Sequence, residues 1–300
     1  MRHLMTGKVK EVYLVDDETL EFAYTDNISV FDNIIPSKIP HKGETLCRTA
    51  KYWFGILSEN GIRNHFISEP AKDRMRVERV DVIRDYDSIN GGTVNYLIPL
   101  EVICRHYAAG SLLDRVRAGK ITAEQLGFPK GHEVKYGEKL PTPYIESTTK
   151  LEEHDTNLTD AEAKKMAGLS DREYEEIKET VLRIDGIIDR EAAKRNLIHC
   201  DGKKEFGYDR DRKLMVLDTF GTLDEDRWWD AEEYGKGNIV ELSKEFVRQY
   251  YRDIGYHRKL TEAREKGFAD PAIPALPEDI IEKVSALYVS MYERITGEKF

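Results

Sequence analysis

LIHCDGKKEFGYDRDRKLMVL, residues 197–217, predicts a pair of antiparallel strands joined by a short turn. The runs Leu197–Tyr208 and Leu214–Leu217 contain the apolar side chains, and the charged residues Asp209–Arg212 separate them. The first run starts apolar and continues as a row of acids and bases, which is costly to bury unless the charges are paired. We therefore expect this hairpin to supply both the core of a sheet and a group of functional residues.

Three charged residues of the hairpin should share one face of the sheet. Side chains alternate along a strand, so Asp201, Lys203 and Glu205 project from the same side. A four-residue turn would also place Asp218 opposite Lys203. Carboxylates beside one lysine can hold Mg²⁺ through oxygen while the ammonium steadies a phosphate or a carboxylate. The alternative is an exposed strand with cross-strand salt bridges, and the spacing alone leaves both open.

Hydrophobic periodicity and turn residues indicate further elements on both sides of the hairpin. They are a β-hairpin over 9–24, a helix over 48–57, a buried strand over 94–104, a helix over 112–117, a surface loop over 127–150, a helix over 170–188 and a helix over 280–295. Strands before and after long helices, without regular alternation, favour an antiparallel α+β fold over a doubly wound sheet. We divide the chain into a β-rich N-terminal subdomain, residues 1–90, and a larger α+β subdomain, residues 91–300.

The composition argues against several classes of protein. The 300 residues carry 46 Lys and Arg against 56 Asp and Glu, and a formal net charge of −10 is poorly suited to tracking nucleic-acid phosphates. No run approaches the ~18 apolar residues of a membrane span, and the first residues do not resemble a signal peptide. Cys47, Cys104 and Cys200 lack CxxC spacing, which fits a reducing compartment better than a disulfide framework or a zinc cluster. We expect a cytoplasmic protein that acts on small molecules rather than on nucleic acid or membranes; a homo-oligomer is left open.

Two basic segments suit phosphate groups. Gly7-Lys8-Val9-Lys10 lacks the GxxxxGK spacing of a Walker A loop, so its lysines either cover nucleotide phosphates as part of a hairpin or are simply solvated. Arg105 follows an apolar strand, and Gly110-Ser111 begins a helix whose free N–H groups suit a phosphate monoester. The alternative for this second segment is that Arg105 pairs with a nearby carboxylate while Ser111 caps the helix.

Two polar segments offer further candidates. Ser147–Asp155 places hydroxyls, Lys150, His154 and several acids on what we predict to be a loop, and loops often carry binding residues. His154 is a candidate general base, although a lone exposed histidine rarely has that role. Asp26–Asp32 sets acids and a hydroxyl around apolar anchors, a pattern more typical of a turn than of a site.

The order of these motifs along the chain is more specific than any one of them. They are Gly7-Lys8-x-Lys10-x-Val12-Tyr13, Asp26–Asp32, Pro40-His-Lys-Gly43-Glu44, Glu101-x-x-x-Arg105-x-x-x-x-Gly110-Ser111, Ser147-x-x-Lys150-x-x-x-His154-Asp155 and Asp201-x-Lys203-x-Glu205-Phe206-Gly207. This succession resembles the SAICAR synthetase family over essentially the whole chain. The blocks Arg105–Ser111 and Asp201–Gly207 are highly specific to that family.

The resemblance implies an ATP-dependent ligase that uses Mg²⁺ and joins CAIR, a carboxylated aminoimidazole ribotide, to L-aspartate. The products would be SAICAR, ADP and phosphate, formed through an acyl phosphate, and an antiparallel N-terminal sheet would cover an ATP cleft formed with the larger subdomain. The implied sites are Lys8 and Lys10 at the ATP phosphates, Glu205 and Asp218 at the metal and nucleotide, Arg105 and Ser111 at the ribotide phosphate, Asp201 and Lys203 at the imidazole end, and Lys150, Asp155 and Arg227 at further substrate contacts. Of these, Lys203, Asp201 and Lys10 are the expected catalytic residues.

One segment departs from the family pattern. After Asp218 the family usually carries a second acid and then a Ser/Thr-Pro-Asp turn before the arginine, whereas Thr219–Arg227 lacks both the second acid and the proline and is one residue longer. Glu225 or Asp226 is the candidate replacement for the second acid. The departure keeps open a family-like ligase with another amine or carboxylate. A lysine-bearing hairpin over ATP with paired acids for Mg²⁺ would also serve a small-molecule kinase, and a non-catalytic nucleotide-binding regulator is a further alternative.

Overall fold

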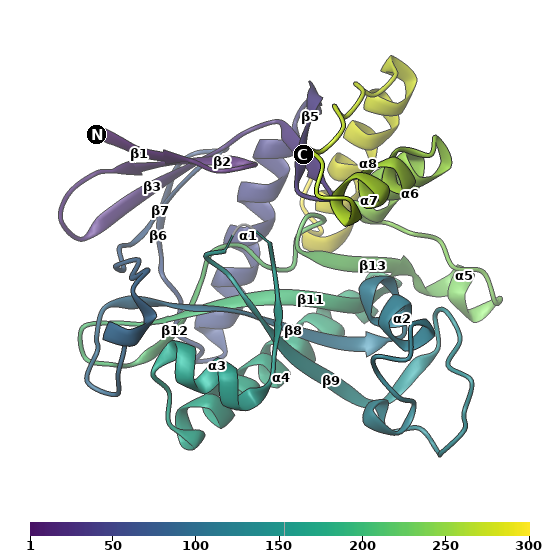
Figure 1. Ribbon diagram of the computed structural model, residues 1–300. Helices are drawn as coiled ribbons and strands as arrows, with labels where there is room; N and C mark the ends of the chain where they lie inside the picture. Colours follow the sequence, from purple (N-terminus) through teal and green to yellow (C-terminus); the bar gives the residue numbers. More distant parts are fainter. Residues whose placement is uncertain (153) are drawn as a thin grey trace.

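The computed structural model describes residues 1–152 and 154–300 and shows an α+β fold with antiparallel sheets (Figure 1). A large sheet crosses the middle of the molecule, and a smaller N-terminal sheet lies above one end of it in this view. This confirms the fold class predicted from the sequence. Its features matter here chiefly because they bring distant charged residues together.

The large sheet is organised around β11 (Leu197–Tyr208), the first strand of the predicted hairpin. Its strand order is β10–β9–β8–β11–β12, and β13 also pairs with β11. All of these pairings are antiparallel. The other strands are β8 (Tyr96–Tyr107), β9 (Lys139–Thr149), β10 (Asn157–Leu158), β12 (Leu214–Leu217) and β13 (Asp226–Asp230).

Strands β12 and β13 share one edge of β11 and leave a gap between them. β12 pairs with residues 205–208 and β13 with residues 197–202, while β8 occupies the opposite edge. The connecting residues 218–225 therefore leave the sheet beside Lys203, whose backbone N–H donates to the Glu225 carbonyl at 3.3 Å. The topology thus carries this connecting segment to the centre of the sheet.

The register of the predicted hairpin is shifted by one residue. Glu205 pairs with Leu217, so continuing the register would set Asp218 level with Lys204 and not, as predicted, with Lys203. The turn is longer because the Asp209 carboxylate accepts hydrogen bonds from the backbone N–H groups two and four residues later, at 2.9 and 2.8 Å. Such side-chain bonding favours a wider turn than a four-residue count assumes.

The surface loop predicted over residues 127–150 is wrong for its second half. Lys139–Thr149 is β9, and it pairs with β8 along much of its length. Pro141 and Pro143 concealed this strand, because proline is normally confined to edge positions in a sheet. β10 pairs with β9 only at Thr148 and Ser147, so the prolines lie where that edge of β9 has no paired strand.

The N-terminal sheet has the order β1–β2–β3–β7–β6 and contains the predicted first hairpin. Its strands, with the separate β4–β5 hairpin, are β1 (Arg2–Thr6), β2 (Lys10–Leu14), β3 (Thr19–Tyr24), β4 (Asn27–Val30), β5 (Asn33–Lys38), β6 (Phe66–Ala71) and β7 (Arg74–Glu78). Phe31 and Asp32 join β4 to β5 with φ values of +51° and +68°. The turn expected over Asp26–Asp32 is confirmed only for these two residues, since Asn27–Val30 forms strand β4, and the turn places both of them beside the cavity described below.

The helices cover the sheets and close the core. They are α1 (Lys42–Glu59), α2 (Gly110–Arg117), α3 (Asp160–Ala167), α4 (Asp171–Ala193), α5 (Ala231–Gly235), α6 (Glu245–Asp253), α7 (Tyr256–Glu265) and α8 (Glu278–Thr296), with short 3₁₀ turns at Tyr86–Ser88 and Glu124–Leu126. α4 begins with the predicted capping box of Ser170 and Glu173 and packs on β11 and β8. α1 packs on α8, which ends at Gly297 in the left-handed conformation.

Buried apolar residues from both parts of the chain form one continuous cluster, which includes Trp53 and Phe54 of α1 and Val216 of β12. The division at residue 90 stays a prediction. Cys47, Cys104 and Cys200 are buried free thiols. Within the described residues, no helix combines the length and apolarity needed to cross a bilayer.

Candidate active site

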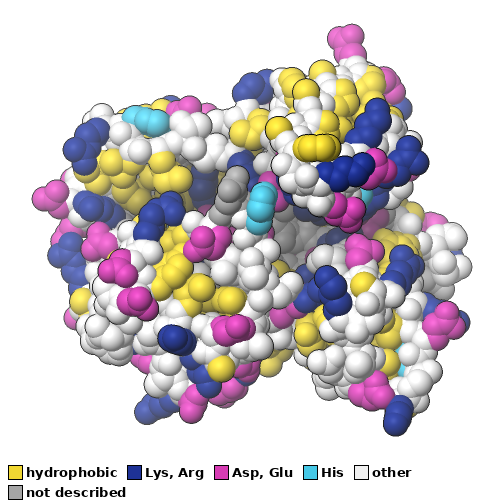
Figure 2. All heavy atoms as spheres, in the orientation of Figure 1, with side chains coloured by type: hydrophobic (Ala, Val, Ile, Leu, Met, Phe, Trp, Pro, Cys, Tyr) yellow, Lys and Arg dark blue, Asp and Glu magenta, His cyan; other side chains and the backbone are white. Residues whose placement is uncertain are grey.

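A cavity of about 810 Å³ lies between the N-terminal sheet, the large sheet and helices α6 and α7. Figure 2 shows a hollow beneath the α6–α8 region with charged side chains at its rim. Every site residue expected from the sequence lines this cavity, namely Lys8, Lys10, Arg105, Ser111, Lys150, Asp155, Asp201, Lys203, Glu205, Asp218 and Arg227.

Lys10 joins the N-terminal sheet to the large one. Its Nζ forms an ion pair with the carboxylate of Asp218, 208 positions away in the sequence. Burial opposes ionisation of Asp218, but Lys10 and Lys150 outweigh burial and hold the pKa of its carboxyl well below the usual range. Lys8 is more exposed and pairs with Asp32 at 2.7 Å. The hairpin and the amino-terminal lysines therefore meet in one place, as predicted.

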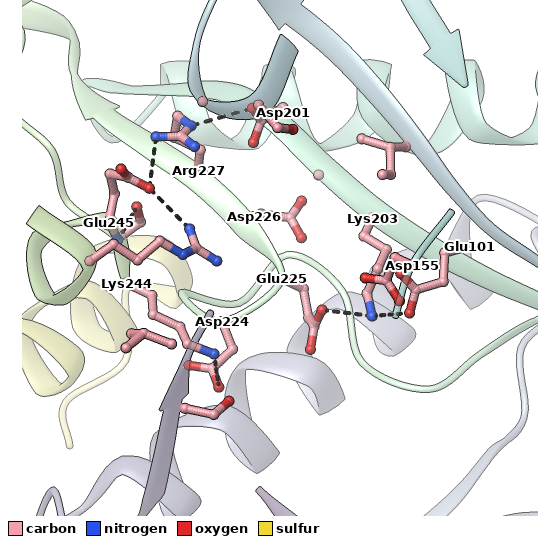
Figure 3. A pocket seen from close by; sticks show the side chains of 18 of the residues that line it. Glu101, Asp155, Asp201, Lys203, Asp224, Glu225, Asp226, Arg227, Lys244 and Glu245 are labelled. Carbon is pink, nitrogen blue, oxygen red and sulfur yellow. Dashed lines mark hydrogen bonds and ion pairs between the residues drawn. The ribbon is translucent and has the colours of Figure 1, made fainter. Parts of the chain in front are cut away.

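Three carboxylates surround Lys203, and Figure 3 shows two of them, Glu101 and Glu225. Its Nζ lies 2.6 Å from Glu101 Oε1, 3.2 Å from Glu205 Oε1 and 3.2 Å from Glu225 Oε2. Burial disfavours the ammonium, but these carboxylates together outweigh burial and raise the pKa of Lys203 well above its usual value. Lys203 is therefore a fixed positive charge at neutral pH.

Two neighbours of Lys203 have shifted pKa values as well. Burial raises the pKa of Glu101 to about 7, with Lys203 acting against this shift and Glu205 adding to it. Burial opposes the charge on Lys150, but its ion pair with Glu205 outweighs burial and raises the pKa of this lysine. The centre of the cavity thus holds permanent ammonium groups beside closely spaced carboxylates.

Arg105 and Arg227 form a second charged group around Asp201. Arg105 donates from Nε to Glu146 at 2.7 Å, from Nη1 to Asp201 Oδ2 at 3.4 Å and from Nη2 to Ser111 Oγ at 3.1 Å. Arg227 Nε reaches the same Asp201 oxygen at 3.3 Å. The two readings of Arg105 are thus partly reconciled: it does pair with carboxylates, but the Ser111 side chain binds the guanidinium and does not cap α2.

The first turn of α2 lies directly against Arg227. Gly110 has a φ of +52°, and a Cβ there would lie 2.5 Å from Arg227 Nη2, so only glycine allows this approach. Burial opposes ionisation of Asp201, but Arg227 and Arg105 lower the pKa of its carboxyl. Two guanidinium groups beside a helix N-terminus have the chemistry that binds a phosphate monoester.

Comparison with known proteins agrees with this geometry. A profile of the SAICAR synthetase family matches residues 3–263. The chain belongs to this family. Phosphoribosylaminoimidazole-succinocarboxamide synthase of Thermoplasma acidophilum is 51% identical over 300 residues, which cover 100% of both chains.

Solved structures of SAICAR synthetases share the fold. A SAICAR synthase from Saccharomyces cerevisiae, complexed with SAICAR, has a TM-score of 0.77 and 25% identity over 99% of this chain and 95% of the other. A SAICAR synthetase in complex with ADP has a TM-score of 0.70 and 28% identity over 99% and 98% of the two chains. The sequence-based assignment to the SAICAR synthetase family is thereby confirmed.

The segment that departs from the SAICAR synthetase pattern gives its two acids different positions. Glu225 extends into the cavity and contacts Lys203. Asp226 borders the cavity, but its Oδ2 accepts from His199 Nε2 at 2.6 Å and its Oδ1 from the Gly221 backbone N–H at 2.7 Å. Glu225 is therefore the acid that adds a carboxylate to the centre of this site.

Three basic residues that line the cavity of this SAICAR synthetase family member, here called the basic wall, were not predicted from the sequence. Lys244, Arg248 and Arg252 line the cavity, and their spacing of four residues puts them on one face of the α6 helix and its start. The signal in the sequence is the repeat of a basic residue every four positions, Lys244, Arg248 and Arg252. Burial lowers the pKa of Lys244, although Asp224 at 3.4 Å acts in the opposite direction (Figure 3).

The polar segment 147–155 is divided between strand and loop. Ser147 and Thr149 belong to β9 and are buried, so their predicted loop placement is wrong. Lys150 and Asp155 line the cavity. The side chain of His154 is 59% exposed and lies 3.9 Å from Asp32, which favours a surface position over a general base. The Glu153 position lies outside the described residues.

The carboxylates at the centre fit a magnesium ion. Glu205 and Asp218 both line the cavity, Lys150 interacts with each of them, and Glu101 and Glu225 lie around Lys203 nearby. Carboxylate oxygens are the protein ligands that Mg²⁺ prefers, usually one or two together with substrate phosphates. The donor set is therefore suited to a magnesium–triphosphate.

Proposed function

We propose that this chain catalyses the ATP-dependent condensation of CAIR with L-aspartate to give SAICAR, ADP and phosphate. The observation that carries the proposal is the contact of Lys10 with Asp218, which sets amino-terminal lysines beside the carboxylates of the large sheet in one cavity. The same cavity holds the arginine pair at Asp201. Support comes also from the SAICAR and ADP bound to the two structural relatives.

We assign the ATP phosphates to Lys8 and Lys10, and a magnesium ion to Glu205 and Asp218. Mg²⁺ bound there would neutralise the triphosphate and stabilise the charge that develops during phosphoryl transfer. Lys10 would exchange its contact with Asp218 for one with phosphate, because both partners then gain a stronger counter-charge. This exchange would couple nucleotide binding to the position of the N-terminal sheet.

Two steps complete the proposed reaction. A CAIR carboxylate oxygen attacks the γ-phosphorus, the bond to ADP breaks, and an acyl phosphate forms. The aspartate amine then attacks the acyl carbon, phosphate leaves and a proton is released. Lys203, held in place by carboxylates, would stabilise negative charge on the transferring phosphoryl group, and Asp201 would orient the ribotide.

The arginine pair would hold the ribotide at its other end. Arg105 and Arg227 both offer charge-assisted donors beside the first turn of α2, and Ser111 adds a hydroxyl to the same pocket. Lys150 and Asp155 would contact substrates from the loop after β9. The basic wall of α6 supplies further positive charge toward an anionic amino acid or phosphate.

The test is an assay with ATP, Mg²⁺, CAIR and L-aspartate, following SAICAR and ADP. We expect stoichiometric formation of both, and no turnover in the complete mixture would refute the proposal. Replacing aspartate with other amino acids identifies a related ligase of different specificity. A stable phosphorylated product that forms without any amine would instead indicate a small-molecule kinase. Cytoplasmic location and oligomeric state stay predictions.

A further inference from the structure

Behind the active site, a buried carboxylate reaches across β11 because a glycine leaves room for it. Gly202 lies opposite Asp226, and a Cβ on Gly202 would lie 1.9 Å from Asp226 Oδ2 and 2.8 Å from His199 Nε2. The register of β11 and β13 also shifts between His199 and Asp201. The backbone is thus shaped to let Asp226 meet His199, whose side chain is fully buried.

The carboxylate of Asp226 closes the segment that precedes it. Asp226 Oδ1 accepts from the Gly221 N–H at 2.7 Å, while the Asp226 N–H donates to the Thr222 carbonyl at 3.0 Å. These bonds fix a compact turn from Gly221 to Asp226. Glu225 and Arg227 lie on either side of Asp226 in the sequence, and both of their side chains extend into the cavity.

Asp226 belongs to a buried cluster of charged residues on the α4 side of the sheet. Lys204 Nζ forms an ion pair with Asp185 of α4 and lies 3.5 Å from Asp226 Oδ2. His199 Nδ1 lies 3.6 Å from Asp189. The pKa of His199 is raised to about 9, since the nearby carboxylates of Asp185 and Asp189 and the hydrogen bond to Asp226 together outweigh burial. A charged His199 donor is therefore directed at Asp226 at neutral pH.

We propose that His199 is a positioning residue that, through Asp226, holds Glu225 against Lys203 and Arg227 against Asp201. The proposal rests on the ligase activity proposed above, and it assigns His199 no contact with substrate. It explains why a chain with an altered segment after Asp218 still presents a carboxylate and a guanidinium to the cavity. In this chain the buried His199–Asp226 pair holds the conformation of the turn, which lacks the proline of the family pattern.

The test compares His199→Leu with His199→Gln, whose Nε2 can still donate to Asp226. We expect kcat/KM for CAIR to fall at least tenfold in H199L and to lie within threefold of wild type in H199Q. In a Glu225→Gln background, H199L should lower kcat by a smaller factor than it does in the wild type, because one of the two residues that His199 positions has already lost its charge. His132→Leu is the control, since His132 pairs with Glu138 and not with any residue of this buried cluster.

Amide hydrogen exchange gives a readout that does not depend on turnover. H199L should speed exchange of the Gly221 and Asp226 amides at least tenfold, whereas H132L should change it less than threefold. Equal activity loss in H199L and H199Q, or unchanged exchange at both amides in folded H199L, would overturn the proposal. If H199L does not fold, Asp226→Asn takes its place with the same expectations. Absence of turnover by the wild type refutes the proposed function alone.

Discussion

The ammonium of Lys203 and its carboxylates depend on one another. Without it, Glu101, Glu205 and Glu225 would place negative charges together in a buried site, where burial already raises the pKa of Glu101. Lys203→Ala should lower kcat by at least a hundredfold, since loss of one charge stabilising a transition state typically costs about 10²–10³ in rate. Lys213→Ala, an exposed lysine on the same hairpin, should leave kcat within twofold. Steady-state kinetics measure both, and a K203A enzyme of normal kcat would contradict the role.

Arg105 should act mainly in binding. It contacts Ser111 in the pocket assigned to the ribotide phosphate, away from the carboxylates around Lys203. We expect Arg105→Ala to raise KM for CAIR on the order of 10- to 100-fold, from the ~1.5–3 kcal/mol of a charged hydrogen bond, with a smaller change in kcat. Initial-rate measurements with varied CAIR test this. A fall in kcat at unchanged KM would place Arg105 at the reacting group instead.

His199 should make stability depend on pH. Its folded pKa of about 9 lies above the ordinary 6.5, because Asp185, Asp189 and Asp226 outweigh both burial and the nearby Lys204. Its contribution is fully present below pH 6.5 and is lost as pH rises toward 9, where the folded state releases its extra proton. Wild-type unfolding free energy should fall by on the order of 3 kcal/mol over this window. Denaturant titrations should show a flatter profile for His199→Gln; identical profiles would contradict the assignment.

Short, charged motifs in the sequence predicted which residues line the cavity. Asp201, Lys203 and Glu205 followed directly from strand alternation, and all three line the cavity. Partners on other elements were not accessible in this way. Glu146, which binds Arg105, lies in strand β9, where the sequence predicts a loop. Glu225 could not be distinguished from Asp226 as the acid in the cavity, because the sequence does not show the gap between β12 and β13.

At the scale of elements, the start of α4 is an independent test of local sequence signals. Ser170 Oγ accepts from the Glu173 N–H, and the Glu173 carboxylate accepts from the Ser170 N–H at 2.8 Å. Ser170→Ala should lower the unfolding free energy by about 1 kcal/mol, the usual value for a lost N-cap. Thermal unfolding measures this, with Ser290→Ala, an exposed position on α8, as a control. Activity at a temperature where both are folded should be unchanged.

Local signals predicted elements well and pairings less well. The capping box and the helical spacing of apolar residues predicted α4 directly. Strand β9 was not predicted, because prolines favour a loop unless they lie at a sheet edge with no paired strand, and the sequence does not show where that edge is. The hairpin register failed by one residue because Asp209 bonds its own turn. Such errors arise where tertiary context decides between local alternatives.

For the whole molecule, the contact of Lys10 with Asp218 implies that nucleotide binding stabilises both sheets together. MgATP at about one hundred times its Kd should raise the unfolding free energy by about 2.7 kcal/mol, as a ligand bound only to the folded state must. Removing divalent metal with EDTA should abolish both this shift and turnover, and added Mg²⁺ should restore them. Calorimetry and the ligase assay measure the two effects. An undiminished shift in EDTA would contradict metal binding at Glu205 and Asp218.

The surroundings of Gly221 have a practical consequence. The indole Nε1 of Trp53 donates to the Gly221 carbonyl at 3.0 Å, and Trp228 and Trp229 follow directly in β13. These are the three tryptophans of the chain, so its tryptophan emission originates next to the turn that carries Glu225 and Arg227. Unlabelled enzyme thus has a built-in optical probe, and mixing it rapidly with substrates should reveal in real time whether that turn shifts during a catalytic cycle.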